Sequence, residues 1–365
     1  MRYSKPLAAG CALAIALGAA ACGSSSSSSS SSGGSSGGTL NGAGSTFQAP
    51  LVGEWAKRFK ESNGVTVNYD PIGSGGGIAQ FSAGTVDFGG TDAAMKPDEL
   101  ATAQKKGAPL HIPIALGAVT VSYNVSGVKT GLKLDGATIA NIFLGKVTKW
   151  NDPAIAGQNA GVTLPATSIT VCHRSDESGT TKNFTAFLVD YSKAWASGPG
   201  SDKSVQWPTG TGAKGNDGVA GCVKQTQGAV GYVEQAFALQ NNFTTADVKN
   251  KAGNYVAPSL AATSAAGTGV TPPPDLRFAT INADGAQTYP ITAVTFELTW
   301  QDPCKAGLSK TVAANLKGWF DYVLGTGQSI APQLQYAALP PEIKTKAQAK
   351  VDSMTCNGAA ISASS

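Results

Sequence analysis

The sequence is poor in the residues that carry most catalytic and metal chemistry. It holds two histidines in 365 residues and no Cys-x-x-Cys pair, which disfavours both a zinc site and a histidine-based catalytic centre. Charged residues make up only 14% of the chain, and the net charge of +4 is too small and too evenly spread to indicate nucleic acid as a partner. Any anion must therefore be bound by local donors and not by a bulk positive field.

Sequence motifs of nucleotide-binding proteins and hydrolases are also missing. No Gly-x-x-x-x-Gly-Lys-Ser/Thr loop occurs, and no Gly-x-Ser-x-Gly elbow. Residues 210–215 match G-x-G-x-x-G, but "SVQWPT" before them is a poor strand and "NDG" is a poor helix start, so a loop is predicted. His173 is the only plausible general base, and we interpret it as a polar residue at a strand end. His111 is interpreted as structural. No metal, cofactor or catalytic residue is predicted.

No segment after the N-terminus is apolar for long enough to span a bilayer. Arg2 and Lys5 precede the apolar run 7–21, "LAAGCALAIALGAAA", and a serine tract follows it at once. This charge and length pattern is typical of an export signal, because 15 apolar residues are short for a membrane-spanning helix. We therefore predict a signal peptide over 1–21 and an exported chain.

The signal ends in "GAAAC", which is similar to the lipobox of bacterial lipoproteins. Its cysteine, Cys22, would become the lipidated first residue, although Ala19 stands where leucine is commoner. Residues 22–38 then form the lipidated cysteine and a Ser/Gly tether, which lacks the apolar groups needed for a core. This resemblance places the protein at the outer face of the cytoplasmic membrane, on a cell surface or in a periplasm.

The remaining cysteines predict a disulfide framework. Of the six cysteines, Cys11 leaves with the signal and Cys22 is the lipid site, so four remain. An even number in an exported chain favours two disulfides, and four cysteines allow three pairings. We prefer the pairing that keeps each bond within one lobe, which is Cys172 with Cys222 and Cys304 with Cys356.

The order of the segments predicts an α/β fold in two lobes. A chain of this length suggests two lobes of about 150 residues each, and strand-like and helix-like segments alternate from residue 39 onward. Leu51, Trp55 and Phe59 have the four-residue spacing of a helix face. The apolar run 111–125 predicts a buried strand that can leave the first lobe, and 257–275 is predicted to be a loop.

Three stretches share one design, in which a strand ends, a turn of small polar residues follows and a helix begins. They are "NGAGSTFQ" (41–48), "PIGSGGGIA" (71–79) and "HRSDESGTT" (173–181). Helix starts present unpaired N–H groups and positive dipole ends, which suit an anion. A single such turn is usually a plain N-cap. Three in one chain, one of them with an arginine, predict an anion site.

These motifs, together with "VDFGGTD", "VTKWNDPAI", "YPIT" and "LPP", strongly resemble the substrate-binding lipoproteins of Pst-type ABC phosphate transporters. The resemblance runs from about residue 41 to 342. It implies a type II periplasmic-binding-protein fold with a hinge of two crossing strands and a ligand cleft between two lobes, residues 39–121 with 291–365 and residues 122–290. The implied function is to bind inorganic phosphate outside the cytoplasm and deliver it to the membrane permease subunits, as a monomer without catalysis.

Carried over position by position, the resemblance implies a set of phosphate-binding residues drawn from both lobes. These are Thr46, Phe47 through its N–H, Ser74, Asp92, Arg174, Asp176, Ser178, Gly179 and Thr180. One departure is Glu177, where some members carry glycine; its carboxylate must point away from the anion.

The residue types suggest how such a site works. Arg174 offers a planar fork of donors, and Asp176 can hold that fork in place. Asp92 is expected to accept the proton that phosphate carries near neutral pH and that sulfate lacks. Two alternatives remain open: a secreted enzyme of the phosphatase or serine-hydrolase class, and a surface adhesin or sensor on the same fold.

Overall fold

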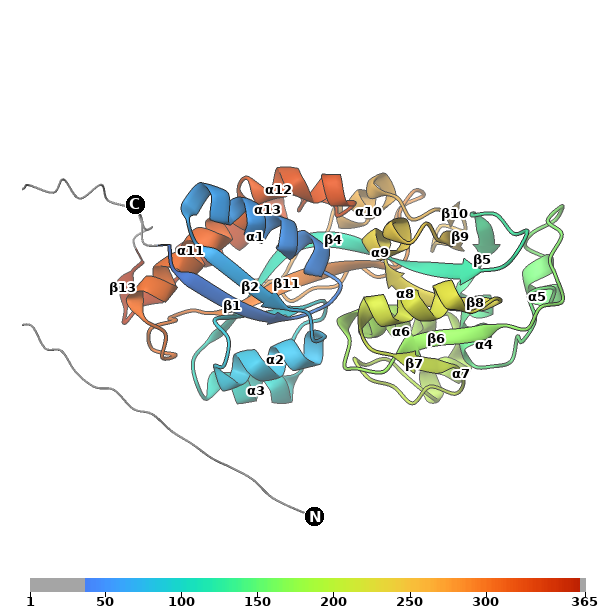
Figure 1. The fold of residues 1–365 in the computed structure, drawn as a ribbon, viewed down its shortest axis with the longest axis horizontal. Helices are drawn as coiled ribbons and strands as arrows, with labels where there is room; N and C mark the ends of the chain where they lie inside the picture. Colours follow the sequence, from blue (N-terminus) through green and yellow to red (C-terminus); the bar gives the residue numbers. More distant parts are fainter. Residues whose placement is uncertain (1–36, 362–365) are drawn as a thin grey trace, which may run out of the picture. The chain divides into compact units, whose positions relative to one another are not determined.

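A computed structural model describes residues 37–361, so the predicted signal peptide, Cys22 and nearly all of the Ser/Gly tether lie outside the described residues. Within 37–361, no helix combines the length and the apolar character that crossing a membrane requires. The described part of the chain is a mixed α/β structure (Figure 1).

Eight strands follow one another in a continuous hydrogen-bonded order, β2-β1-β3-β11-β4-β8-β6-β7. β1 is parallel to both β2 and β3, whereas β11 is antiparallel to its neighbours β3 and β4. Beyond β4 the strands β8, β6 and β7 continue, with β6 parallel to both β8 and β7. The strands are β1 (Thr39–Gly44), β2 (Thr66–Asp70), β3 (Phe88–Thr91), β4 (Pro109–Asn124), β5 (Leu132–Leu134), β6 (Thr170–Arg174), β7 (Thr211–Ala213), β8 (Ala229–Glu234), β9 (Thr244–Lys249), β10 (Tyr255–Val256), β11 (Thr292–Trp300), β12 (Thr355–Cys356) and β13 (Ala359–Ala360).

The long strand β4 joins the two lobes, as the apolar run 111–125 predicted. Its residues 109–118 pair with β11, and its residues 119–124 pair with β8. We call the part built on β1, β2, β3, β11 and the first half of β4 the first lobe, and the part built on the rest of β4, β8, β6 and β7 the second lobe. We propose the expected boundaries, 39–121 with 291–365 and 122–290, because the change of partner on β4 and the start of β11 lie close to them.

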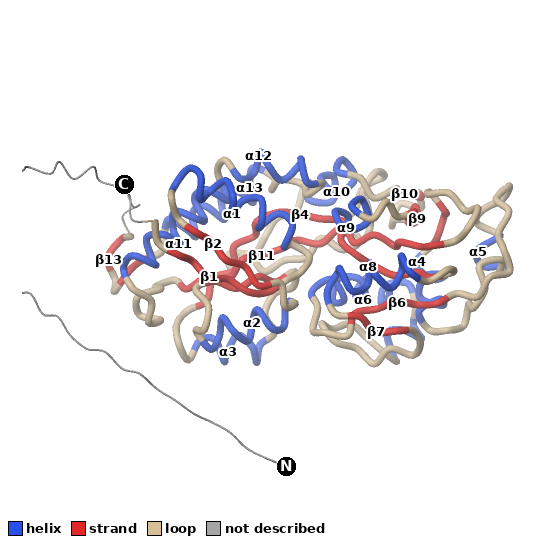
Figure 2. Tube along the Cα trace, in the orientation of Figure 1, coloured by secondary structure: helices blue, strands red, loops and turns tan. Residues whose placement is uncertain are grey.

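Helices cover the strands of both lobes. In the first lobe, α1, α11 and α13 lie on one side of the strands and α2 and α3 on the other (Figure 2). The helices are α1 (Ala49–Asn63), α2 (Ser74–Ala83), α3 (Pro97–Gln104), α4 (Gly136–Phe143), α5 (Pro153–Ala156), α6 (Gly179–Tyr191), α7 (Lys193–Ser197), α8 (Gly215–Gln225), α9 (Gln235–Gln240), α10 (Leu260–Gly267), α11 (Lys310–Leu324), α12 (Gly327–Ile330), a 3-10 turn (Ala331–Leu334) and α13 (Pro341–Asp352).

The predicted helix face of α1 is buried. Trp55 and Phe59 pack against Trp319 of α11, with ring centroids 6.5 and 5.4 Å from that of Trp319. Full burial of one such side chain contributes roughly 2–3 kcal/mol. The prediction of a loop over 257–275 was wrong in part, because α10 lies within it. Its alanine-rich sequence favours a helix, and Ser259 caps the start by accepting a hydrogen bond from the N–H of Ala262.

Both disulfides have the preferred pairing. Cys172 in β6 is bonded to Cys222 in α8, within the second lobe, and Cys304 is bonded to Cys356, within the first. Each closes a loop of about 50 residues, which in the chain-entropy account contributes roughly 4 kcal/mol by restricting the unfolded chain. Each bond therefore stabilises one lobe and leaves the lobes free to move relative to each other.

Candidate functional site

The three predicted turns all lie at the start of a helix that follows a strand. Thr46 and Phe47 lie between β1 and α1, Ser74 is the first residue of α2, and Asp92 directly follows β3. In the second lobe, Arg174 ends β6 and Ser178 caps α6 by accepting a hydrogen bond from Thr181 N–H, 3.1 Å away. All three turns therefore have the predicted local structure, in which small polar residues follow a strand and a helix begins.

Arg174 is fixed by Asp176 in the way the sequence suggested. Its Nε donates to Asp176 Oδ1 at 2.7 Å and its Nη2 to Oδ2 at 2.5 Å, a bidentate pair. Only 1% of the Arg174 side chain is exposed. Burial alone would raise the pKa of the Asp176 carboxyl. The hydrogen bonds and positive charge of Arg174, together with a hydrogen bond from the N–H of Gly215, outweigh that effect and lower the pKa. The remaining nitrogen, Nη1, lies 3.4 Å from Thr180 Oγ1, which turns the free part of the fork toward the start of α6.

Asp92 is a buried carboxylate surrounded by hydroxyl donors. Ser45 Oγ donates to its Oδ2 at 2.6 Å, and Thr295 Oγ1 of β11 donates to its Oδ1 at 2.7 Å. Burial raises the pKa of Asp92 to about 6, and these hydroxyls together with the charge of Arg174 and the Ser74 hydroxyl limit the rise. Asp92 is thus mostly ionised at neutral pH and able to accept a further hydrogen bond. The sequence analysis named neither Ser45 nor Thr295.

Ser74 connects the two lobes. Its Oγ accepts the N–H of Gly179 at 3.0 Å and the N–H of Asp92 at 3.3 Å. Because two N–H groups already point at this oxygen, its own hydrogen is directed at an acceptor, and Asp92 Oδ2 lies 3.4 Å away. The second and third predicted turns therefore meet face to face, although more than 100 residues separate Ser74 from Gly179 in the chain.

A fourth turn, which sequence reasoning missed, completes the cluster. The loop prediction for 210–215 was wrong: Thr211–Ala213 is strand β7 and Gly215 begins α8. Asn216 is fully buried there and donates through Nδ2 to Thr46 Oγ1 at 2.8 Å, with Thr180 Oγ1 at 3.4 Å. The short β7 has little strand character of its own and forms by pairing with β6. The sequence feature that could have identified this turn is Gly215 followed by the polar Asn216 at the start of a helix, since the other three turns also combine glycine and small polar residues at a helix start.

Glu177, the departure from the family pattern, lies at the outer edge of this cluster. Its side chain is exposed and lies over Gly75, where a Cβ would come 2.1 Å from Glu177 Oε2. The N–H of Gly75 donates to the backbone oxygen of Glu177 at 3.0 Å. Glycine at position 75 therefore allows the close approach of the two lobes. The expected orientation of its carboxylate, away from the anion, stays a prediction that the exposure of Glu177 supports.

Two ion pairs also bridge the lobes. Lys203 of the second lobe donates to Glu99 Oε1 of α3 at 2.5 Å, with 3% and 16% of their side chains exposed. Lys96 and Asp202 form the second pair at 2.9 Å, with 45% and 41% exposed. Together with the contact between Ser74 and Gly179, these pairs hold the two lobes closed on each other.

The two histidines have the structural roles that were expected. His173 stacks on Trp207 with ring centroids 4.6 Å apart, and its Nδ1 lies 2.9 Å from the backbone oxygen of Arg174. His111 accepts the N–H of Met95 at 3.1 Å, and burial lowers the pKa of His111 to about 4. Neither ring lies in the hydrogen-bonded cluster described above.

Sequence comparison places this chain among known binding proteins. Residues 29–326 match the family described as the PBP superfamily domain. The chain is 41% identical to the phosphate-binding protein PstS of Pasteurella multocida (strain Pm70) over 315 residues, 86% of this chain and 89% of that protein. It is 36% identical to the phosphate-binding protein PstS3 of Mycobacterium bovis (strain BCG / Pasteur 1173P2), over 87% of this chain and 86% of that protein.

Solved structures share the fold at lower sequence identity. A high affinity periplasmic phosphate-binding protein, PfluDING, bound with phosphate, has a TM-score of 0.70 at 22% identity, covering 85% of this chain and 93% of that one. A putative phosphate ABC transporter substrate-binding protein from Clostridium perfringens, with bound phosphate, has a TM-score of 0.60 at 16% identity, covering 83% of this chain and 100% of that one. These likenesses establish the two-lobed fold.

Proposed function

This chain belongs to the PstS phosphate-binding proteins of the PBP superfamily, and from that premise we propose that it binds inorganic phosphate in the cluster between its lobes. Its function is phosphate binding for ABC transport, and it is a binding protein and not an enzyme. The enzyme and adhesin alternatives have no observation in their favour.

One observation carries the assignment of the site. Contacts between distant segments support it: Ser74 accepts the N–H of Gly179, Thr46 accepts from Asn216, and Asn216 and the buried guanidinium of Arg174 both lie 3.4 Å from Thr180 Oγ1. Such donors at helix starts suit a compact anion. We assign the binding set as Thr46, Phe47, Ser74, Asp92, Arg174, Asp176, Ser178, Gly179 and Thr180.

The donors are partly engaged with one another in this conformation. The N–H of Phe47 donates to Ser45 Oγ at 3.0 Å and that of Gly179 to Ser74 Oγ at 3.0 Å. Phosphate oxygens would accept from these N–H groups together with, or in place of, the serine hydroxyl oxygens. Binding therefore exchanges one hydrogen bond for another and does not leave buried groups without partners. Asp92, ionised above about pH 6, would accept the phosphate hydroxyl.

The finer parts of the function belong to the same proposal. The signal peptide 1–21 is removed, Cys22 is lipidated, and residues 22–38 tether the binding protein at the outer face of the cytoplasmic membrane. The closed lobes then present phosphate to the permease subunits of a Pst-type transporter. Radiolabelled palmitate incorporated by the wild-type chain and not by Cys22→Ser tests the anchor.

Calorimetric titration of the purified protein tests the ligand. Phosphate and arsenate are expected to bind and sulfate to bind far more weakly, with the titrations repeated on either side of about pH 6, where Asp92 changes charge. Equal heats for phosphate and sulfate above that pH, or no phosphate binding at all, would contradict the proposal.

A further inference from the structure

The side chain of one buried glutamic acid lies outside the anion cluster, although its backbone N–H donates to Asn216 Oδ1 at 2.9 Å. Glu234 ends β8, lies opposite Val119 of β4, and is fully buried. Its Oε2 caps α9 by accepting the N–H of Ala236 at 2.7 Å. The same Oε2 lies 3.0 Å from the hydroxyl oxygen of Tyr336, which comes from the other lobe.

If Glu234 is ionised, the Tyr336 hydroxyl has too few hydrogens for its two oxygen neighbours. The Tyr336 hydroxyl oxygen lies 2.6 Å from the backbone oxygen of Phe47 and 3.0 Å from Glu234 Oε2. A tyrosine hydroxyl has one hydrogen, and the carbonyl of Phe47 has none. If that hydrogen goes to Phe47, the closer of the two, the contact with Glu234 needs a hydrogen from the glutamic acid itself. An ionised Glu234 would leave two buried oxygens facing each other without a hydrogen between them.

The electrostatic surroundings favour the same protonation state. Glu234 Oε1 is buried and makes no hydrogen bond within the described part of the chain. Burial raises the pKa of Glu234 well above its ordinary value, and the negative charge of Asp92 adds to the rise. The titratable groups with the largest effect on the pair are Asp92, Tyr69 and Tyr336 itself, and none of these three is a cation. An unpaired carboxylate here would carry a large desolvation cost.

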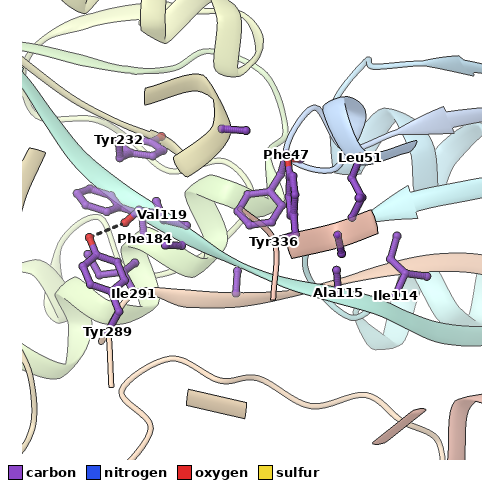
Figure 3. Close-up of a cluster of buried hydrophobic side chains, with 14 of the residues drawn as sticks. Phe47, Leu51, Ile114, Ala115, Val119, Phe184, Tyr232, Tyr289, Ile291 and Tyr336 are labelled. Carbon is purple, nitrogen blue, oxygen red and sulfur yellow. Dashed lines mark hydrogen bonds between the residues drawn. The ribbon is translucent and has the colours of Figure 1, made fainter. Parts of the chain in front are cut away.

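The backbone carbonyl that accepts the Tyr336 hydrogen is that of Phe47, which belongs to the first predicted anion-binding turn. The ring of Phe47 packs edge-on against that of Tyr336, with centroids 6.1 Å apart (Figure 3). It also lies on Gly117 of β4, where a Cβ would come 2.5 Å from the tip of the ring. Phe47 is therefore held by its ring on the hinge strand and by its carbonyl through Tyr336, next to Thr46.

We propose that Glu234 is a positioning residue that works as a carboxylic acid: it donates its proton to the Tyr336 hydroxyl, which donates to Phe47 O, and this relay holds the Thr46–Phe47 turn in its anion-binding geometry. The inference rests on the proposed phosphate function. Loss of the Glu234 proton breaks the relay, so phosphate affinity falls in the alkaline range, beyond the pH at which phosphate has become the dianion.

Phosphate titrations from about pH 7 to about pH 10, run on the wild type and the variants at each pH so that the ionisation of phosphate itself is common to both, test the relay. The wild type is expected to lose affinity toward the alkaline end. Tyr336→Phe removes the hydroxyl of the relay. In Glu234→Gln the amide nitrogen can only donate and the amide oxygen can only accept, so no single atom can both donate to Tyr336 and accept the N–H of Ala236 as Oε2 does. Each variant is therefore expected to bind about tenfold more weakly near pH 7 and to show no alkaline decline.

Two matched controls separate this role from general destabilisation. Tyr289→Phe deletes a buried hydroxyl that donates to Val119 O at 3.0 Å on the same strand β4. Glu297→Gln removes another buried carboxyl, whose pKa burial raises to about 8, so that it ionises within the tested range. Both are expected to lower thermal stability or leave it unchanged while keeping the wild-type alkaline decline. Infrared spectra should contain a protonated-carboxyl band that Glu234→Gln removes.

The outcomes distinguish the inference from the proposed function. No phosphate binding by the wild type at any pH means that the proposed function fails. Phosphate binding with an alkaline decline that persists in Glu234→Gln and Tyr336→Phe overturns the inference alone. A wild-type affinity that stays flat across the range, or an infrared spectrum unchanged by Glu234→Gln, also overturns it.

Discussion

The two lobes contribute different chemistry to the same cluster. The second lobe supplies the positive charge, through Arg174 held in a bidentate pair by Asp176. The first lobe supplies hydroxyls and a negative group, through Thr46, Ser74 and Asp92. No lysine or arginine of the first lobe takes part in the hydrogen bonds of this cluster as the described residues form it.

Because the positive charge lies in one lobe and the carboxylate in the other, we propose that the second lobe mainly provides affinity for an anion and the first lobe provides selectivity for phosphate. A guanidinium attracts any small oxyanion, so the second lobe alone would not distinguish phosphate from sulfate. In the proposed site, Asp92 would accept a proton from the ligand and repel an anion that has none, so the first lobe would test the protonation of the ligand. Under this proposal, phosphate is selected only when both lobes contact it.

The largest expected effect comes from removing the charge of the second lobe. Arg174→Ala should weaken phosphate binding by about 3 kcal/mol or more, because charge-assisted hydrogen bonds are lost and Asp176 keeps an unpaired charge. Calorimetry with phosphate measures the change. Lys182→Ala, which removes a half-buried lysine of helix α6 in the same lobe, is the control and should bind nearly as the wild type. A titration unaffected by Arg174→Ala would mean that the arginine is structural.

Next, the selectivity of the first lobe should depend on Asp92. Asp92→Asn should narrow the ratio of phosphate to sulfate affinity by about tenfold or more, because the amide no longer repels an unprotonated anion. Asp87→Asn is the matched control, since Asp87 precedes the same strand β3 and instead accepts the N–H of Asn41. Competition titrations with both anions measure the ratio. An unchanged ratio in Asp92→Asn would contradict the proton-acceptor role.

The same selectivity should depend on pH. Asp92 accepts a hydrogen bond from phosphate only while ionised, and its pKa is raised to about 6. The preference for phosphate is therefore present above about pH 6 and decreases as the pH falls through that value. Affinity ratios measured from about pH 5 to about pH 8 check this. Asp92→Asn should show no such step, and a wild-type ratio that rises on acidification would be inconsistent with the role.

Closure should depend on the buried ion pair between the lobes. Lys203→Met removes a charge that meets Glu99 only when the lobes are closed. It leaves a mostly buried carboxylate without its partner, so phosphate affinity should fall about tenfold. Small-angle scattering with and without phosphate should detect a larger open fraction in the variant. Affinity and closure equal to those of the wild type would exclude a part for this pair in bringing the lobes together.

The smallest effect is expected from the exposed pair. Lys96 and Asp202 are each more than 40% exposed, so solvent screens their attraction. Lys96→Ala should change phosphate affinity by less than about 0.5 kcal/mol. Measured beside Lys203→Met, it shows whether burial decides the strength of an interlobe ion pair; a loss as large as that of Lys203→Met would contradict this explanation.

The predictable part of the site is local in the chain. The turns at Thr46, Ser74 and Ser178 were identified because small polar residues before an amphipathic helix have the same conformation in most folds. The turn at Asn216 was missed because β7 forms only by pairing with β6, so its own sequence shows little strand character. Ser45 was missed although it is adjacent to Thr46, because adjacency does not reveal which hydroxyl faces Asp92.

The unpredictable part depends on contacts between distant segments. Thr295 lies 203 residues from Asp92, and Asn216 lies 170 residues from Thr46. No periodicity links such positions, so only the pairing of β11 with β3 and the contact between the lobes bring them together. The same holds for Glu234, Tyr336 and Phe47, whose hydrogens can be counted only when all three oxygens are placed.

The sequence by itself determined the alternation of strands and helices, the glycine and serine turns at helix starts, and the number of cysteines available for disulfides. These features depend on backbone preferences and side-chain spacing within about ten residues. Only the tertiary structure decided which oxygens are buried and which donors face Asp92 and Glu234. Burial and partners set the cost of a charge, and both are properties of the folded chain.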